Sequence, residues 1–219
     1  MSPPDPGGSH RAGLSPARVR DAALKLIDRD GVDGFSMRKL ATELGVEAMS
    51  LYRHAPGKDA ILDGVIDEVA AGVVLDPASP DWRAQVRLFA LGLREQLVTH
   101  PNVFRLVLVR PLTTPLPLRG PSVLRATEQL LEVLSRGGLD RPAAAAAYRR
   151  IISFVMGRVL VELRPIAVDP DEPEPALRLG LHHLPAQEYP RLREQVGHLT
   201  AFDGETEFRA GLEDLVASH

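Results

Sequence analysis

No cysteine occurs among the 219 residues of the chain, which excludes disulfides, thiolate zinc sites and cysteine nucleophiles together. No stretch approaches the roughly 18 consecutive apolar residues that a membrane span requires. The first 14 residues lack the apolar segment of an export signal. These absences predict a protein of the cytoplasm that does not enter a membrane.

Signatures of catalysis are also missing. The sequence has no G-x-S-x-G motif, no glycine-rich phosphate loop and no residues with metal-ligand spacing. His182 and His183 are adjacent, so on a helix they point apart and chelate poorly, and a loop or helix-cap role fits them better. We predict no catalytic residue, no metal and no cofactor, with an all-helical enzyme as the alternative.

Charge is distributed unevenly along the chain. The net charge is −3, yet the segment from Arg11 to Lys58 holds nine basic and six acidic residues. A mildly positive section on an acidic body favours an anionic partner that meets this section alone. The apolar fraction of 44% is that of a globular protein with a buried core, and the length allows one large domain or two small ones.

Apolar residues recur with helical spacing along the chain, without a strand pattern or an internal repeat. Ser15 and Ser36 are expected N-caps, and Gly31 and Gly45 are expected helix stops. The pattern predicts an all-α protein with helices over residues 16–30, 37–44, 47–54, 58–74, 82–100, 101–109, 122–136, 142–163, 186–199 and 205–217.

Composition predicts how the chain is divided. Residues 1–14 are rich in Pro, Gly and Ser and are expected to form a disordered tail whose removal leaves folding intact. The DPASPD segment at 76–81 is typical of a linker. We therefore expect a helix-turn-helix domain over 15–75 and a larger helical domain over 82–219.

The stretch GVEAMSLYRHAPGK at 45–58 has the spacing of a helix-turn-helix, with a glycine turn before a short helix. Val46 and Leu51 are expected in the core of three helices. The opposite side of the short helix offers small, aromatic and basic side chains to a DNA major groove: Ala48, Met49, Ser50, Tyr52, Arg53 and His54.

Several of these residues have a defined chemical partner on DNA. Ala48 or Met49 can meet a thymine methyl group, and Arg38 on the preceding helix can form two parallel hydrogen bonds with guanine. Lys58 opens the next helix, whose free N–H groups favour a phosphate. Ser36 and Lys39 are further backbone candidates. On these residues alone, Tyr52 as packing, His54 as a helix cap and Lys39 as a solvated residue remain alternatives.

The segment GVDGFSMRKLATELGVEAMSLYRHAPGKDAILDGVIDEV resembles the N-terminal domain of the TetR family of bacterial transcriptional regulators. The resemblance covers residues 15–70, through the Gly-Val turn, the LYRH segment and the lysine that opens the next helix. Later residues resemble the regulatory domain of the tetracycline-repressor branch more loosely, through VRP, GRVLVE and ETEFRAGLEDLV. The resemblance implies a homodimeric repressor that binds a palindromic operator and is released by a small molecule.

The resemblance also implies individual DNA contacts. Base contacts fall to Arg38, Ala48, Met49 and Tyr52, and backbone contacts to Ser36, Met37, Ser50, His54 and Lys58. Met37 replaces the usual threonine or serine, so no hydrogen bond is expected there. Ala48 and Met49 replace polar or proline residues common in relatives, so the operator sequence should differ from theirs.

The resemblance further implies a four-helix bundle between two copies, built from residues 142–163 and 205–217. The helix at 142–163 is apolar on more than one stripe, which exceeds what one core face needs. A central buried helix within one chain is the alternative.

The expected effector site is mostly apolar with few polar anchors. Its candidates are Phe89, Leu93, Val103, Leu106, Arg110, Pro111, Phe154 and Met156. Arg110 is the charged anchor, because Arg-Pro here resembles the family's ligand loop, with a surface salt bridge as the alternative. Val74, Leu106 and Phe89 stand where tetracycline repressors carry two histidines and an amide, so an apolar effector is expected rather than a magnesium–drug chelate. An activator, or a vestigial pocket, stays open.

Overall fold

The computed structural model describes residues 14–53, 55–113, 115–163, 172–185, 187–201 and 203–217, without the side chains of Val109, residues 111–113 and Pro175. Within these residues the regular structure is helical and no strand occurs, which confirms the all-α prediction. No described helix is both long and apolar enough to cross a membrane. Most of residues 1–14, expected as a tail, lie outside the described part.

The chain forms two compact units. The first comprises Met1–Val69 and Asn102–Val123, and the second comprises Ala70–Pro101 and Leu124–His219. Residues 102–123, expected from the sequence in the second domain, group here with the first unit. The domain boundaries at 15–75 and 82–219 stay a prediction.

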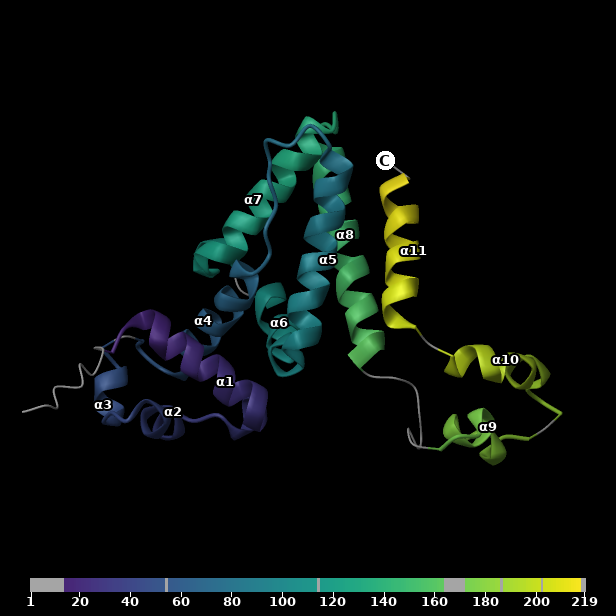
Figure 1. Ribbon diagram of the computed structural model, residues 1–219, viewed down its shortest axis with the longest axis horizontal. Helices are drawn as coiled ribbons and strands as arrows, with labels where there is room; N and C mark the ends of the chain where they lie inside the picture. The colour runs from purple at the N-terminus through teal and green to yellow at the C-terminus, as the bar shows by residue number, and fades with distance from the viewer. Residues whose placement is uncertain are drawn as a thin grey trace, which may run out of the picture. The chain divides into compact units, whose positions relative to one another are not determined.

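The first unit is built around the N-terminal helices (Figure 1). Its elements are α1 (Pro16–Gly34), α2 (Met37–Leu44), α3 (Ala48–Leu51), α4 (Lys58–Ala71), α6 (Pro101–Thr113) and the 3-10 turn η1 (Leu116–Leu118). Apolar residues from α1 to α4 fill its core, each at most 2% exposed: Val19, Ala23, Leu26, Ile27, Leu40, Leu51, Ile61 and Val65. The expected helical spacing of α1 and α4 therefore becomes the buried face of the unit.

Three of the expected local signals, Ser15, Ser36 and Gly45, lie at helix ends, whereas Gly31 interrupts α1 without ending it at residue 30. Ser15 Oγ accepts a hydrogen bond from Arg18 N at 3.3 Å, and Ser36 Oγ accepts one from Lys39 N at 3.2 Å. Gly45 takes a φ of 65° after α2, and Gly31 takes a φ of 73° that interrupts α1. Both glycines adopt left-handed backbone that side chains with a Cβ rarely accept.

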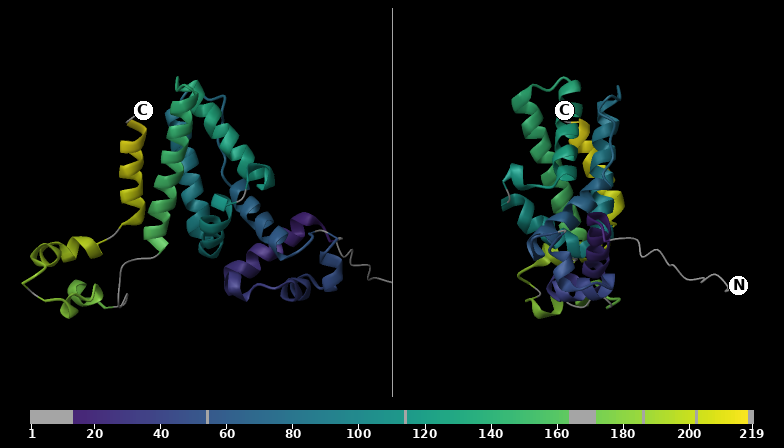
Figure 2. Two further views of the ribbon diagram at one scale, coloured as in Figure 1. Left: turned by 180° about the vertical axis from the view of Figure 1, so that it is seen from behind. Right: turned by 90° about the vertical axis from the view of Figure 1, so that its left-hand side faces the viewer.

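The second unit consists of α5 (Trp82–Thr99), most of α7 (Pro121–Arg136), α8 (Arg141–Leu163) and the C-terminal elements. The last are α9 (Pro175–Arg178), the 3-10 turn η2 (Leu181–His183), α10 (Pro190–Thr200) and α11 (Gly204–Ala217). α5, α8 and α11 pack on one another, and α8 and α11 run side by side in opposite directions (Figures 1 and 2). Their shared core includes Phe89, Leu97, Val155, Val159, Phe208 and Leu212.

Several expected boundaries were wrong. Helix α3, expected over residues 47–54, ends at Leu51. One further helical hydrogen bond follows, from Ala55 N to Leu51 O, and the series stops there because Pro56 has no N–H to donate. The fourth helix ends at Ala71 rather than 74, α6 continues to Thr113 rather than 109, and α10 begins at Pro190 rather than 186. The short elements η1, α9 and η2 were not predicted.

Candidate nucleic-acid interface

The short helix α3 is held by one buried side chain. Leu51 is completely buried, whereas Met49 is 74% exposed, so the two sides of the helix differ sharply. The turn before α3 is fixed by hydrogen bonds from Gly45 N to Thr42 O and from Val46 N to Ala41 O, at 3.1 and 3.0 Å. α2, the left-handed Gly45 and α3 therefore form the expected helix-turn-helix, with one face of α3 left open to a partner.

Most of the predicted DNA contacts are accessible. Arg38, Met49, Tyr52, Arg53 and Lys58 are exposed. Four other members of the set are half-buried: Ser36, Met37, Ala48 and Ser50. The remaining member of the predicted set, His54, lies outside the described residues.

Two exposed arginines are left available for a ligand. Within the part of the chain that the structure describes, the guanidinium groups of Arg38 and Arg53 make no hydrogen bond or ion pair. An arginine head of this kind presents a planar fork of donors that matches the O6 and N7 acceptors of guanine or a phosphate. The arrangement suits an electrostatic and hydrogen-bonding approach to DNA.

Lys58 and Ser36 each carry a structural contact in addition to the predicted one. Lys58 Nζ donates to Phe35 O at 3.1 Å and lies 5.7 Å from the centre of the Phe35 ring. Since an ammonium group has three N–H donors, Lys58 can hold Phe35 and still donate to an anion. Ser36 caps α2 through its oxygen, which leaves its O–H free to donate.

Lys39 takes part in a cluster of charged side chains around Asp30. Its Nζ lies 3.3 Å from Asp30 Oδ2, and Arg29 Nε donates to Asp30 Oδ1 at 2.9 Å. The hydrogen bond from Arg29 holds the pKa of Asp30 below its ordinary value, against a smaller opposing effect of desolvation, and Lys39 adds to the lowering. This geometry favours the interpretation of Lys39 as a surface residue.

Comparison with known proteins decides the family. The domain described as "Tetracyclin repressor-like, C-terminal domain" matches residues 76–217, and "Bacterial regulatory proteins, tetR family" matches residues 19–65. The chain belongs to the TetR family. This TetR-family chain is 36% identical to an HTH-type transcriptional regulator of Saccharopolyspora erythraea, over 93% of its own length and 84% of that protein.

Further relatives of this TetR-family chain agree. It is 30% identical to the class D tetracycline repressor protein of Escherichia coli, over 94% of its own length and 88% of the relative. The crystal structure of Streptomyces coelicolor ActR in complex with actinorhodin matches with a TM-score of 0.76 and 32% identity, over 94% of this chain and 97% of ActR. The chain is thus a DNA-binding transcriptional regulator with a helix-turn-helix and is not an enzyme, as predicted.

Four of the residues predicted to bind the effector lie on α6, in the first unit. Val103 is completely buried and Leu106 is 7% exposed. Arg110 Nη1 donates to Asp63 Oδ1 at 2.6 Å, and Arg110 Nη2 is bonded to the Asp59 carboxylate on the same helix α4. The salt bridge that sequence left as an alternative for Arg110 is therefore present. The side chain of the neighbouring Pro111 lies outside the described part.

The two aspartates also change the acidity of Arg110. Partial burial by itself lowers the pKa of Arg110, but the hydrogen bond and charge of Asp63, with the charge of Asp59, outweigh it, and the net pKa is raised. Arg110 therefore keeps its positive charge in this TetR-family protein, and an anionic group on a ligand would have to compete with both carboxylates.

The other four predicted effector residues lie in the second unit. Phe89 on α5 is 3% exposed, and Leu93, Phe154 and Met156 are half-buried. The Phe154 ring centre lies 5.1 Å from that of Phe208 on α11, so Phe154 contributes to the packing of α8 on α11. The eight residues are thus split between the two units, and their common role in one site stays a prediction.

Polar pairs that sequence reasoning missed lie among the helices of the second unit. The hydroxyl oxygens of Thr127 on α7 and Tyr148 on α8 are 3.4 Å apart and partly buried. Arg94 on α5 makes two hydrogen bonds with Glu162 on α8, at 3.0 and 2.7 Å. No motif marks either pair, because each joins residues from two helices.

The two adjacent histidines lie on the 3-10 turn η2. The ring centres of His182 and His183 are 3.8 Å apart and the rings are tilted by 45° to each other, so the two side chains are in contact. The sequence favours a loop or helix-cap role for them, and they lie on a short turn and not on a long helix. Among the described residues, no group of three or more His, Cys, Asp or Glu side chains is placed to hold a metal ion.

Proposed function

We propose that this protein is a repressor that binds a palindromic operator as a homodimer and is released by a small, largely apolar effector. The observation that carries the proposal is the helix-turn-helix of a TetR-family chain whose reading side is open, with Arg38 and Met49 exposed beside the buried Leu51. Such a repressor acts in the cytoplasm, where the operator DNA is.

In this proposal the exposed side of α2 and α3 enters a major groove. Arg38 supplies the most specific contact, two hydrogen bonds to one guanine, while Met49 offers an apolar surface to a thymine methyl group. Backbone contacts set the register of the protein on the duplex without reading sequence. Bases are contacted by Arg38, Ala48, Met49 and Tyr52, and the sugar–phosphate backbone by Ser36, Met37, Ser50, Arg53, His54 and Lys58.

The dimer is proposed to form through α8 and α11. A two-fold axis would set the two copies of α3 roughly 34–36 Å apart, one turn of DNA, so the operator should be an inverted repeat. The exposed Leu160 and Val161 near the end of α8 support an additional contact surface, since they are apolar side chains left open in the single chain.

The effector is proposed to act on residues Phe89, Leu93, Val103, Leu106, Arg110, Pro111, Phe154 and Met156. ActR, a related protein, has been solved in complex with actinorhodin and with (S)-DNPA, which supports a small organic ligand. An effector can release DNA only if it binds the DNA-free state more tightly than the DNA-bound state. Candidate compounds can be screened by the rise they cause in the thermal unfolding midpoint.

The test of DNA reading is a binding titration at two salt concentrations. The purified protein is titrated against DNA from upstream of its own gene, with random DNA of equal length alongside. Saturable binding to one fragment, protected over an inverted repeat, is expected. Equal and weak binding to every fragment would send the search to a selection from random oligonucleotides, and failure to enrich any inverted repeat there would overturn the proposal.

Replacing Arg38 with alanine should weaken operator binding by about 1–3 kcal/mol and relax the preference at one base position, because a bidentate guanine contact is lost. Arg125→Ala is the matched control, since Arg125 is also exposed but lies on α7, outside the helix-turn-helix. Both variants are measured on operator and random DNA. An equal loss on both DNAs would show that Arg38 holds phosphate instead of reading a base.

A further inference from the structure

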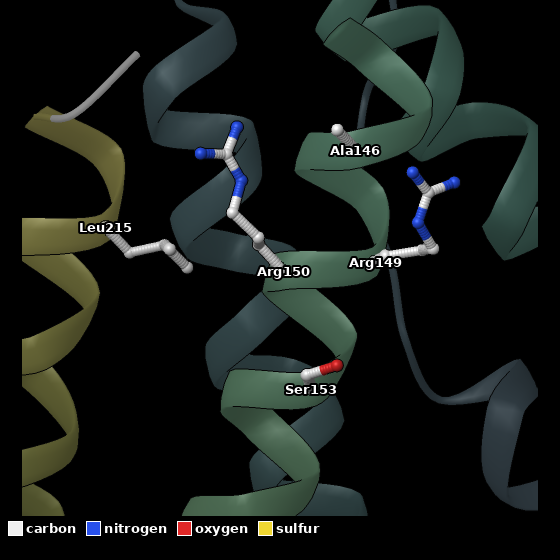
Figure 3. A pocket seen from close by; sticks show the side chains of 5 residues that line it. All are labelled: Ala146, Arg149, Arg150, Ser153 and Leu215. Atoms are coloured by element: carbon white, nitrogen blue, oxygen red, sulfur yellow. The ribbon is translucent and has the colours of Figure 1, made fainter. Parts of the chain in front are cut away.

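A shallow open groove of about 590 Å³ runs between α8 and α11. Ala146, Arg149, Arg150 and Ser153 line it from α8, and Leu215 lines it from α11 (Figure 3). In this view Arg150 leans towards α11, while Arg149 extends from the other side of α8. The groove therefore combines small and apolar side chains with a positively charged edge.

Several charged side chains on these two helices are already paired within the chain. Arg87 on α5 makes two hydrogen bonds with Glu213 on α11, at 2.7 and 2.8 Å, and Arg158 on α8 donates to Glu207 on α11 at 2.9 Å. The hydrogen bond from Arg87 holds the pKa of Glu213 below its ordinary value, and the Glu213 carboxylate is therefore already paired within the chain.

Arg149 and Asp214 differ from these pairs. Both are exposed, and within the described residues neither makes a hydrogen bond or an ion pair. One belongs to α8 and the other to α11, so the two helices carry unused charges of opposite sign. A surface that offers both signs in this way is complementary to a second copy of itself.

The two charges also lie at the same level along the helices. Leu215, the neighbour of Asp214, points towards α8 at about the level of Arg149 and Arg150 (Figure 3), and all three line the groove. α8 and α11 run in opposite directions, so the first half of α8 lies beside the last half of α11 (Figure 1). A two-fold rotation about an axis parallel to these helices leaves the height of every residue along the axis unchanged. Such a rotation can therefore set α8 of one copy opposite α11 of the other, with Arg149 and Asp214 at the same height.

We propose that the groove receives α11 of a second copy, and that Arg149 pairs there with Asp214 of the partner subunit. Symmetry makes the pair twice, once on each side of the axis. The inference rests on the homodimer proposed above and adds to it the residues that select the partner. The pair lies at the rim of the interface, where charges govern partner choice more than total affinity.

The test uses full-length chains in which one charge of the pair is reversed. Arg149→Glu sets two acidic groups against each other at both symmetry-related positions, and Asp214→Arg sets two basic groups there. Each single variant should therefore form a homodimer with a dissociation constant raised about tenfold at low salt. Arg125→Glu is the control, because it makes the same change of net charge at an exposed residue of α7. This variant should dimerise like the wild type.

Mixing the two variants restores both attractions. The carboxylate introduced by Arg149→Glu in one chain then faces the guanidinium introduced by Asp214→Arg in the other. On the second side of the axis, the unchanged Arg149 faces the unchanged Asp214. Native mass spectrometry of mixed chains that carry tags of different mass should show the heterodimer well above the half expected from random assortment. The excess should shrink at high salt, because exposed charges are screened.

A single chain carrying both substitutions should regain the wild-type dissociation constant, because each reversed charge then meets a reversed partner. This chain and the mixture test the pair in two independent ways. Sedimentation velocity over a dilution series gives the dissociation constant for the wild type, each single variant, the doubly substituted chain and the Arg125→Glu control.

The Arg149–Asp214 pair and the homodimer can fail separately in these experiments. A dimeric wild type with random assortment of the variants, or a chain with both substitutions that stays as weak as the single ones, overturns the Arg149–Asp214 pairing and leaves the homodimer intact. A wild type that sediments as a monomer at micromolar concentration overturns the homodimer itself. Heterodimer preference together with recovery by the chain carrying both substitutions establishes the pairing.

Discussion

Replacing Leu51 with alanine should destabilise the helix-turn-helix by about 2–5 kcal/mol and abolish specific DNA binding, because it leaves a cavity in a closed core. Leu51 is 0% exposed, and it is the buried residue of the four-residue helix α3. So short a helix has almost no stability of its own and depends on this contact. The loss would be a large part of the 5–15 kcal/mol, roughly, that stabilises a typical domain.

Met49 on the same helix supplies the matched control. It is 74% exposed, so Met49→Ala should change the free energy of unfolding by no more than about 0.5 kcal/mol. Urea unfolding and operator titration are measured for both variants. Leu51→Ala should fail in both experiments and Met49→Ala only in DNA binding. Unchanged unfolding of Leu51→Ala would contradict the role of Leu51 as the anchor of α3.

Breaking the Arg94–Glu162 pair should be the second large effect, on the stability of the second unit. The two side chains are only 14% and 18% exposed and are joined by two hydrogen bonds, at 3.0 and 2.7 Å. Arg94 also lies 5.5 Å from the centre of the Phe208 ring. Arg94→Met should cost about 3 kcal/mol, since it leaves the carboxylate of Glu162 without its partner in a poorly solvated place.

The variant with methionine at both positions distinguishes a lost pair from lost packing. Two apolar side chains of similar length leave no unpaired charge, so this variant should be more stable than Arg94→Met. Thermal unfolding of the wild type, Arg94→Met, Glu162→Met and the double variant gives the coupling energy between the two side chains. A double variant as unstable as the sum of the single ones would show that the pair itself contributes nothing.

An exposed ion pair supplies the control for this second effect. Arg136 and Glu132 are 53% and 47% exposed and lie one helical turn apart on α7. Arg136→Met should therefore cost less than about 0.5 kcal/mol, because water solvates the carboxylate that remains.

The DNA-reading part of the molecule was predictable to a large extent from sequence. Ser36, Gly45 and Leu51 carry the cap, the turn and the anchor, and the cap and the turn act on residues within about four positions of themselves. The exposure of Arg38 follows from the helical spacing of α2 once Leu40 and Ala41 are buried. The exposure of Met49 follows in the same way once Leu51 of α3 is buried. The end of α3 was placed three residues too late, because the residues that follow Leu51 directly have no feature that forbids a further helical turn.

The regulatory part was predicted less well, and Arg110 shows why. The Arg-Pro pattern suggested a ligand anchor, yet Arg110 is bonded to Asp59 and Asp63, about fifty positions earlier in the chain. The sequence has 26 basic and 29 acidic residues, so almost any arginine has many candidate partners. Nothing in the order of the residues selects one of them.

By itself, the sequence determined most of the helices and the helix-turn-helix, because these depend on spacing and on caps that act over one or two turns. It also indicated the family, through the resemblance of its N-terminal segment to TetR regulators. Only the tertiary structure decided that Arg94 meets Glu162, that Arg110 meets α4, and that Arg149 and Asp214 are left without partners among the described residues. The physical reason is that ion pairs form between whichever charges the packing of the apolar faces brings within reach. That packing is a property of the whole fold and not of any one segment.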